Sequence, residues 1–354
     1  MRVAVLNDYS LPKALIAAQS GEYPRHHTWG VSEFSRLGAA VTSMPFFGDR
    51  LGALRPAKLR YILQSLLAQL LLVSLQWRFD VVYAACQSET WLLARLRHWG
   101  LFRRPLVVMI HHPICGRLRG GHTFMAGHDR LLFLSDHLRE KEIANHPFAA
   151  EKMYSMAWGG DLDFYDNQKR IPHDFGDGFF ISAGKANRDH DLLAKAAGGI
   201  NAKTVIVCSD RARPHEPVPE NVSVLSDTTG HAMSYLDLLS AYRSALAVVI
   251  PLVDVDALAG LTSLVDAIAC GKAVVMTRNP YIDIDIESLG FGFWVEPGDV
   301  LGMQRALESL ATEEGLAHRM GQRARAYAES EYNYLAFSER LAASISDVFK
   351  EKHS

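Results

Sequence analysis

The sequence predicts two α/β domains, each built on a doubly wound sheet, and three observations lead to this fold class. The chain has 354 residues, 49% hydrophobic and 21% charged, which is enough to form two cores of ordinary size. Short apolar runs alternate with segments of helical periodicity, a pattern typical of parallel sheets covered by helices. A polar, turn-rich stretch at 159–178 separates two such series and marks a linker.

The apolar runs are the expected buried strands. The first series is RVAVLN (2–7), AAVTSMPF (39–46), FDVVYAA (79–85), PLVVMIHH (105–112) and RLLFLSD (130–136). The second is GFFISAG (178–184), KTVIVCSD (203–210), NVSVLSD (221–227), LAVVIPL (246–252), KAVVMT (272–277) and FGFWVEP (291–297). Helices are expected between them, for example at 192–197, 235–244 and 300–310. We therefore predict Rossmann-like domains over 1–160 and 170–325, followed by a C-terminal segment, 326–354.

Composition indicates a cytoplasmic protein. The start, MRVAVLNDYS, enters an apolar strand without the basic and apolar regions of a secretory signal. The four cysteines lie far apart and form no C-x-x-C pair, which suits a reducing compartment. Residues 1–165 carry 19 Lys and Arg against 13 Asp and Glu, whereas residues 166–354 carry 18 against 26. The basic first half is consistent with an anionic surface or substrate, and equally with chance clustering on solvated faces.

Residues 56–77 are the most apolar stretch of the chain. Its uncharged part is about 17 residues long and contains three glutamines, too short and too polar to span a membrane comfortably. A buried core helix is the favoured interpretation. The alternative is an interfacial helix with Arg55, Lys58 and Arg60 at its rim.

The strongest nucleotide signatures, G-x-G-x-x-G after the first strand and the Walker-type loop, are missing from the sequence. Ligands of doubly wound sheets nevertheless bind at the carboxyl ends of strands. The loop in SAGKANRDHDLLAKA places Lys185 and Arg188 just past Gly184, before a helix that begins near Asp189. Two cations beside helical N–H groups could hold a diphosphate. The same loop could also be a solvated turn in which Asp189 caps the helix.

A second candidate is GLTSLVDAIACGKAVVMT, a glycine turn followed by a helix and a strand. Gly260 allows a ligand to approach the backbone, and Leu261, Thr262 and Ser263 form the start of the helix, where N–H groups and two hydroxyls are available to an anion. Asp266 lies one turn further along, where a carboxylate could hold a ribose by its two hydroxyls. A simple capped helix would explain the hydroxyls equally well.

A third candidate is VVMIHHPICGRLRGGHTF, in which His111 emerges at a strand end before the basic loop Arg117–Arg119. Cys115, His122 and His128 follow closely enough in the sequence to suggest a zinc site. Their spacing lacks the paired knuckle of a zinc site, so no metal site is predicted.

Four stretches together resemble glycosyltransferases of the GT-B fold, specifically the large retaining family of the family-4 type. MAWGGDLDFY is similar to the interdomain segment P-W-G-V-D-x-x-x-F, and SAGKANRDHDLLAKA to the donor loop V-G-R-x…K-G-x-x-x-L-I-x-A. GLTSLVDAIACGKAVVMTRNPYIDI and GFWVEPGDVLGMQRALESL are similar to the two segments that follow in the family. The resemblance covers roughly residues 156–310. It implies two Rossmann-like domains facing each other across a cleft, with a C-terminal helix around 334–349 that returns to the first domain.

The resemblance also implies roles for residues. Lys185 and Arg188 fall where the family has its two phosphate-binding cations, and Asp266 where the second glutamate of E-x7-E holds the ribose. Leu258 stands where the first glutamate would contact the sugar, which is a departure from the family. His111 matches a strand-end histidine near the transferred sugar. With Lys185 and Arg188 neutralising the leaving diphosphate, no metal or other cofactor is required.

The candidate acceptor site lies in the loop after the first strand, where the sequence departs from the family. In place of the glycine pair that many members show after the first strand, GEYPRHHTWG (21–30) supplies Arg25, His27 and Trp29, which could bind an acceptor sugar or phosphate. Core packing of Trp29 is an equally good explanation.

The expected function is transfer of a sugar from a nucleotide-diphosphate sugar to a glycan, a lipid-linked acceptor or a small molecule, with retention. A peripheral contact with an anionic inner membrane face is expected for the lipid-linked case, and no nucleic-acid partner is expected. Two alternatives stay open. One is a sugar-nucleotide 2-epimerase of the same fold. The other is a catalytically degenerate GT-B binding subunit, which Leu258 favours.

Overall fold

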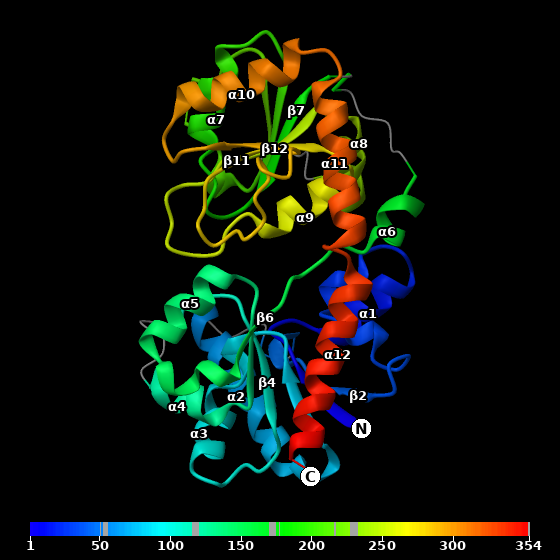
Figure 1. Ribbon diagram of the computed structural model, residues 1–354, viewed down its shortest axis with the longest axis vertical. Helices are drawn as coiled ribbons and strands as arrows, with labels where there is room; N and C mark the ends of the chain where they lie inside the picture. The colour runs from blue at the N-terminus through cyan, green and yellow to red at the C-terminus, as the bar shows by residue number, and fades with distance from the viewer. Residues whose placement is uncertain are drawn as a thin grey trace. The chain divides into compact units, whose positions relative to one another are not determined.

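The computed structural model describes residues 1–49, 51, 56–114, 120–169, 175–176, 178–215, 217–226 and 233–352 (Figure 1). The chain forms two compact units. Unit 1 comprises Met1–Trp158 together with Tyr334–Ser354, and unit 2 comprises Gly159–Asn333. The sequence had placed the end of the first domain at residue 160, the second domain at 170–325 and the C-terminal segment from 326. The division in the structure falls at Trp158 and at Tyr334.

Unit 1 is built on a six-stranded parallel sheet in the order β2-β1-β3-β4-β5-β6. Its strands are β1 (Arg2–Leu6), β2 (Ala40–Ser43), β3 (Val81–Ala84), β4 (Leu106–Ile110), β5 (Arg130–Phe133) and β6 (Met153–Ser155). Five of the six were predicted. The sequence did not predict β6, because a strand of three residues is too short to show a recognisable hydrophobic pattern.

The helices of unit 1 are α1 (Leu11–Gln19), α2 (Ala57–Ser74), α3 (Trp91–His98), α4 (Gly121–Gly127), α5 (Asp136–Asn145) and α12 (Tyr334–Glu351). Short 3-10 turns are η1 (Arg25–Thr28), η2 (Val31–Glu33), η3 (Phe47–Asp49), η4 (Gln76–Arg78), η5 (Gln87–Glu89) and η6 (Pro147–Lys152). Although α12 closes the chain, it packs in unit 1 (Figure 1). Its apolar stripe is buried, and the Tyr334 hydroxyl is hydrogen-bonded to the hydroxyls of Thr28 (2.9 Å) and Ser32 (2.6 Å).

Unit 2 repeats the architecture with a parallel sheet in the order β12-β11-β10-β7-β8-β9. Its strands are β7 (Phe180–Gly184), β8 (Thr204–Cys208), β9 (Val222–Leu225), β10 (Ala247–Ile250), β11 (Ala273–Thr277) and β12 (Gly292–Val295), as the sequence predicted. Its helices are α6 (Leu162–Asn167), α7 (His190–Gly198), α8 (Tyr235–Ser244), α9 (Leu261–Ala269), α10 (Val300–Thr312) and α11 (Leu316–Ser330), with the turn η7 (Asp210–Ala212). One face of the sheet packs with α7 and α10 in a single apolar core.

The connection order of unit 2 creates a switch point between β7 and β10. From β7 the chain proceeds to β8 and β9 on one side, and then returns to β10, β11 and β12 on the other. The loops that follow β7 and β10 therefore leave the sheet in opposite directions, and between such loops lies the usual ligand site of doubly wound sheets.

Helix α2 differs from the favoured prediction. Gln64, Ser65 and Gln69 are buried in it together with Ala68 and Leu72. By contrast, five large side chains are between 37% and 48% exposed, those of Leu59, Tyr61, Ile62, Leu67 and Leu70. The burial of Gln69 has a clear reason, because its side-chain oxygen accepts hydrogen bonds from the first N–H groups of α3, at Leu92 (2.9 Å) and Leu93 (3.2 Å). The prediction of a core helix is therefore wrong for the apolar face. Within the described residues, no helix is long and apolar enough to cross a membrane.

Candidate functional site

The two loops at the switch point of unit 2 are joined by backbone contacts. Asp189 donates its N–H to the carbonyl of Pro251 (3.0 Å), and Val253 donates to the carbonyl of Asn187 (3.3 Å). Arg188 and Leu252 form an isolated antiparallel bridge. The loop after β7 is thus held against the loop that leads from β10 into α9, so the two predicted donor segments form one site.

Helix α9 begins at this site because Gly260 turns the chain in a way that other residues rarely can. Gly260 has φ of +85°, and a Cβ placed there would lie 2.7 Å from the Met276 methyl group on β11. No described side chain caps the helix, so among these residues the N–H groups of its first turn are available to a ligand. Leu261 is buried and Thr262 is exposed.

Arg188 connects the two loops through its side chain. Its guanidinium donates to the Ser263 hydroxyl (2.9 Å) and to the carbonyls of Ala183 (3.3 Å) and Ala186 (3.1 Å). All three acceptors are neutral, and within the described residues no carboxylate pairs with this charge. Burial lowers the pKa of Arg188, yet arginine remains protonated at neutral pH. Gly184 makes room for it, since a Cβ there would approach the guanidinium to 2.5 Å.

Lys185 lies beside Arg188 on the exposed part of the loop. Among the residues that the structure describes, its ammonium group has no hydrogen-bond or ion-pair partner. Asp189 caps α7 by accepting a hydrogen bond from the Leu192 N–H (2.9 Å), as the capped-helix interpretation required. The cap leaves both cations in place. A contact of either cation with phosphate stays a prediction.

Asp266 lies inside unit 2 and is only 4% exposed. One of its carboxylate oxygens accepts hydrogen bonds from two phenol groups, those of Tyr165 on α6 and of Tyr235 on α8 (2.8 Å). Burial raises the pKa of Asp266 to about 6, and the two phenols offset part of that rise. The predicted ribose contact stays a prediction, and any such contact would engage a carboxylate that the protein already holds with two tyrosines.

The position of the missing glutamate, Leu258, is half-buried in the loop before α9. Of the two nearby acids, Asp256 accepts a hydrogen bond from the Tyr281 hydroxyl (2.5 Å). Asp254 is exposed and has no recorded partner among the described residues. Asp254 is therefore the acid in this loop that is available to a ligand.

In unit 1, His111 follows the last residue of β4, as predicted. Its ring Nε2 lies 2.7 Å from the Ala85 carbonyl, an acceptor, so this nitrogen carries the proton. Burial lowers the pKa of His111 to about 4, which keeps the ring neutral at pH 7 and leaves Nδ1 as a hydrogen-bond acceptor. Gln87 fixes the backbone here, because its side-chain oxygen accepts the N–H groups of His111 (2.7 Å) and His112 (3.1 Å).

The predicted acceptor residues of unit 1 separate into two places. Trp29 is only 9% exposed and stacks on Trp158, with ring centroids 5.2 Å apart and planes at 21°. It also meets the His111 ring edge-on at 4.8 Å. His27 lies in the same aromatic cluster, 5.9 Å from Trp158, and burial lowers its pKa to about 4. Core packing is therefore what the structure shows for Trp29, and a contact with an acceptor stays a prediction.

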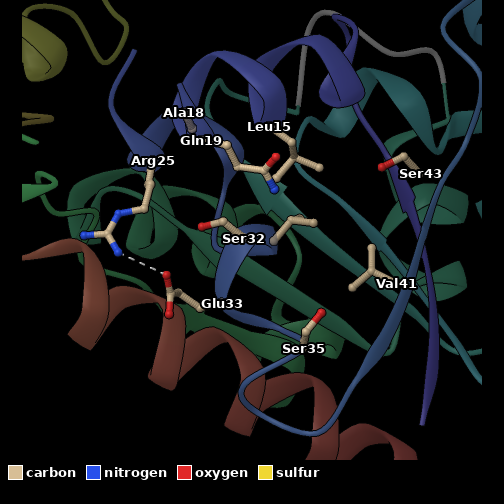
Figure 2. A pocket seen from close by; sticks show the side chains of 10 residues that line it. Leu15, Ala18, Gln19, Arg25, Ser32, Glu33, Ser35, Val41 and Ser43 are labelled. Carbon is tan, nitrogen blue, oxygen red and sulfur yellow. Dashed lines mark hydrogen bonds and ion pairs between the residues drawn. The ribbon is translucent and has the colours of Figure 1, made fainter. Parts of the chain in front are cut away.

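Arg25 lies instead at a pocket formed by α1, η1, η2 and β2. Figure 2 shows the Arg25–Glu33 ion pair (3.3 Å) on one side of this pocket and Val41 and Ser43 on the other. The pocket has a volume of about 410 Å³. Sequence reasoning placed Arg25 with Trp29, but η1 turns the two side chains toward different surroundings.

The two described histidines of the zinc candidate, His122 and His128, both contact protein groups. His128 is buried, and its ring nitrogens lie 2.7 Å from the Phe124 carbonyl and 3.0 Å from the Thr90 hydroxyl. The His122 ring stacks on Phe148 at 4.3 Å. Within the described residues, no group of three or more His, Cys, Asp or Glu could hold a metal. Cys115, the basic loop Arg117–Arg119 and Arg55 lie outside the described residues.

Sequence reasoning missed three side chains that shape these sites, namely Tyr165, Tyr235 and Gln87. Tyr165 falls within the MAWGGDLDFY segment, but nothing in that segment connects it to Asp266, a hundred residues further along. Gln87 follows a strand end, which is the signal that could have found it.

The fold can be compared with solved structures. No family model matches the chain, and no curated protein matches it in sequence. A glycosyltransferase from Rickettsia africae ESF-5 is similar in structure, with a TM-score of 0.69 and 12% identity, over 99% of this chain and 98% of that one. A trehalose 6-phosphate synthase from Burkholderia multivorans has a TM-score of 0.70 and 13% identity, over 99% of each chain. The Anabaena protein HepE, solved with UDP-glucose, has a TM-score of 0.66 and 15% identity, over 98% of this chain and 100% of that one.

These likenesses extend over nearly the whole chain and confirm the predicted fold class, GT-B with two Rossmann-like units. At 12–15% identity they show the fold alone.

Proposed function

We propose that the protein is a glycosyltransferase that moves a sugar from a nucleotide-diphosphate sugar to an acceptor. The observation that carries this proposal is the guanidinium of Arg188. It is half-buried, its hydrogen-bond partners among the described residues are all neutral, and it lies at the N-terminus of α9 at the switch point of unit 2. A charge held without a counter-ion beside free helical N–H groups is a site for an anion, and a diphosphate supplies the charge and the oxygens that such a site requires.

The catalytic role of this site follows from the negative charge that develops on the leaving diphosphate during sugar transfer. When the bond between the sugar and the diphosphate breaks, negative charge grows on the leaving phosphate oxygens. Arg188, Lys185 and the first N–H groups of α9 would stabilise that charge, which is the main catalytic effect we assign to unit 2. Because these groups would perform this role, we propose that no metal is needed. Retention of configuration is proposed from the resemblance of the donor segments to the retaining family.

The solved relatives support the choice of ligand. They include HepE in complex with UDP-glucose and a synthase of trehalose 6-phosphate. In unit 1 the His111 ring is neutral and its Nδ1 is a hydrogen-bond acceptor. We propose that this nitrogen accepts a hydrogen bond from a hydroxyl of the sugar. The acceptor is proposed to be a glycan, a lipid-linked sugar or a small molecule.

A thermal-shift panel of UDP, GDP, ADP and dTDP tests the proposal. At a concentration 100 times its dissociation constant, a ligand that binds only the folded state stabilises it by about 2.7 kcal/mol. We expect one nucleotide to raise the melting temperature, with and without EDTA. The absence of a shift with all four would reject the proposal and favour a binding subunit. Turnover of a nucleotide sugar to its epimer without an acceptor would favour the epimerase.

The exposed face of α2 supports a peripheral membrane contact. Leu59, Ile62, Leu67 and Leu70 are exposed on this helix. The helix also carries Lys58 and Arg60 and belongs to the half of the chain with the positive charge. We propose that this face enters the interface of an anionic bilayer at the cytoplasmic side of the membrane, which would bring the enzyme to a lipid-linked acceptor.

Liposome sedimentation tests this contact. We expect binding to vesicles that contain anionic lipid, weakened by high salt and lost in Leu67→Glu, because a charge on this face would be driven into the interface. Leu301→Glu is the matched control, since Leu301 is 65% exposed on α10 in unit 2. No binding at low salt, or equal binding by Leu67→Glu, would overturn the proposal.

A further inference from the structure

The pocket of unit 1 beside Arg25 has two kinds of wall. Its apolar wall consists of Leu15 and Ala18 from α1, Val31 from η2 and Val41 from β2. Its polar groups come from the same elements, from η1 and from the turn after η2. At about 410 Å³, the pocket falls within the range of small-molecule sites, about 300–1,000 Å³.

Three polar side chains of this pocket are available to a ligand. The Gln19 amide and the hydroxyls of Ser35 and Ser43 line it, and within the described residues none of them has a hydrogen-bond partner (Figure 2). A fourth hydroxyl, that of Ser32, is already hydrogen-bonded to Tyr334 (2.6 Å). The pocket therefore offers one amide and two hydroxyls, which together can both donate and accept hydrogen bonds.

The charged groups of the pocket compensate one another. Arg25 pairs with Glu33 (3.3 Å), and Glu33 also accepts a hydrogen bond from Arg36 (3.1 Å). Arg36 also pairs with Glu339 (3.5 Å), so two arginines and two glutamates leave no net charge at this wall to attract an ion. Charge in the pocket thus favours a neutral ligand.

We propose that this pocket binds a neutral sugar residue of a glycan, at a site separate from the nucleotide site of unit 2. A sugar ring has an apolar face that fits the wall formed by Leu15, Val31 and Val41, and its hydroxyls can exchange hydrogen bonds with Gln19, Ser35 and Ser43. The proposal goes beyond glycosyl transfer, because it requires neither a nucleotide nor turnover.

Calorimetry and saturation-transfer NMR with the full chain test the proposal. The probes are maltose, cellobiose, lactose and N-acetylglucosamine, with glucose 6-phosphate and inorganic phosphate for comparison. We expect at least one neutral sugar to bind and inorganic phosphate not to bind. Failure of all four neutral probes, or preferential binding of the phosphorylated probes, would overturn the proposal.

Two variants locate the binding. Ser43→Trp fills the pocket and should abolish binding of the neutral sugar, whereas Thr42→Trp, on the same strand but outside the lining, should retain it. Gln19→Ala removes an exposed side chain that has no partner among the described residues, so folding should be unaffected. We expect binding to weaken by about three- to tenfold through the loss of one hydrogen bond. Unchanged affinity in both Ser43→Trp and Gln19→Ala would overturn the site.

The nucleotide panel separates this inference from the proposed function. Ser43→Trp should give the same shift with the binding nucleotide as the parent protein. Loss of sugar binding with an intact nucleotide shift supports the pocket. A parent protein that binds neutral sugars in this pocket and no nucleotide would retain the inference and reject glycosyl transfer.

Discussion

Replacing Arg188 with alanine is expected to weaken the binding of the nucleoside diphosphate by about 1.5–3 kcal/mol, the usual contribution of a hydrogen bond to a charged group. In the part of the chain that the structure describes, the guanidinium has neutral partners, so the ligand would be its counter-ion. Lys185→Ala should weaken binding by less, because the ammonium group is exposed and a solvated charge contributes less than a half-buried one. Titration calorimetry with the nucleotide identified by thermal shift measures both effects.

Two controls make this experiment specific. The corresponding nucleoside, which has no phosphates, should bind the parent and Arg188→Ala almost equally. Arg305→Ala removes a largely exposed arginine of α10 and should leave diphosphate affinity unchanged. Full diphosphate affinity in both Arg188→Ala and Lys185→Ala would show that the anion binds elsewhere.

His111→Ala is expected to have the opposite effect to Arg188→Ala, on turnover rather than on nucleotide binding. Because His111 belongs to unit 1 and is assigned to the sugar, its loss should reduce turnover and leave the affinity for free nucleotide nearly intact. His112→Ala should have the smaller effect, since His112 is exposed. Equal turnover in His111→Ala and the parent would remove His111 from the catalytic groups.

Asp266→Asn is expected to make the protein more stable at pH 7.5 than the parent, and the advantage should disappear near pH 4. Burial raises the pKa of Asp266 from 3.8 to about 6 in the folded state, so that state binds the proton more tightly than the unfolded chain does. The contribution of this group is therefore complete below pH 4 and is lost as pH rises through 6. Two pKa units correspond to about 3 kcal/mol.

Chemical denaturation of the parent and Asp266→Asn from pH 4 to pH 8 measures this difference. Asparagine keeps an oxygen that can accept the Tyr165 and Tyr235 hydrogen bonds but carries no charge, so it mimics the protonated acid. Asp254→Asn, at an exposed acid in the same unit, should show no such pH dependence relative to the parent. A constant difference between Asp266→Asn and the parent across the pH range would contradict the raised pKa.

The sequence predicted the elements of the candidate donor site well, since local features specify them. The strand ending at Gly184, the cap at Asp189 and the helix after Gly260 each follow from periodicity, capping chemistry or a left-handed glycine within a few residues. The contact between Arg188 and Ser263 joins residues 75 positions apart, and no local pattern could specify it. The tyrosines on Asp266 were missed for the same reason.

Unit 1 shows where an apolar pattern misleads. The run 56–77 was predicted to be a core helix because its residues are apolar, yet α2 buries Gln64 and Gln69 and exposes Leu59, Leu67 and Leu70. Periodicity identifies a helix, but the neighbours that pack on it decide which face is buried. Here the Gln69 oxygen accepts two N–H groups of the first turn of α3, which explains why this glutamine is buried.

By itself, the sequence determined two parallel α/β units and the segments that bear the candidate cations, because strands, turns and caps are set by neighbours along the chain. Only the tertiary structure decided that Asp266 is enclosed by two phenols, that Trp29 packs on Trp158 while Arg25 lines a pocket, and that α12 packs in unit 1. These outcomes depend on contacts between distant segments. Such contacts form only when apolar surface is buried and polar groups are paired across the whole fold.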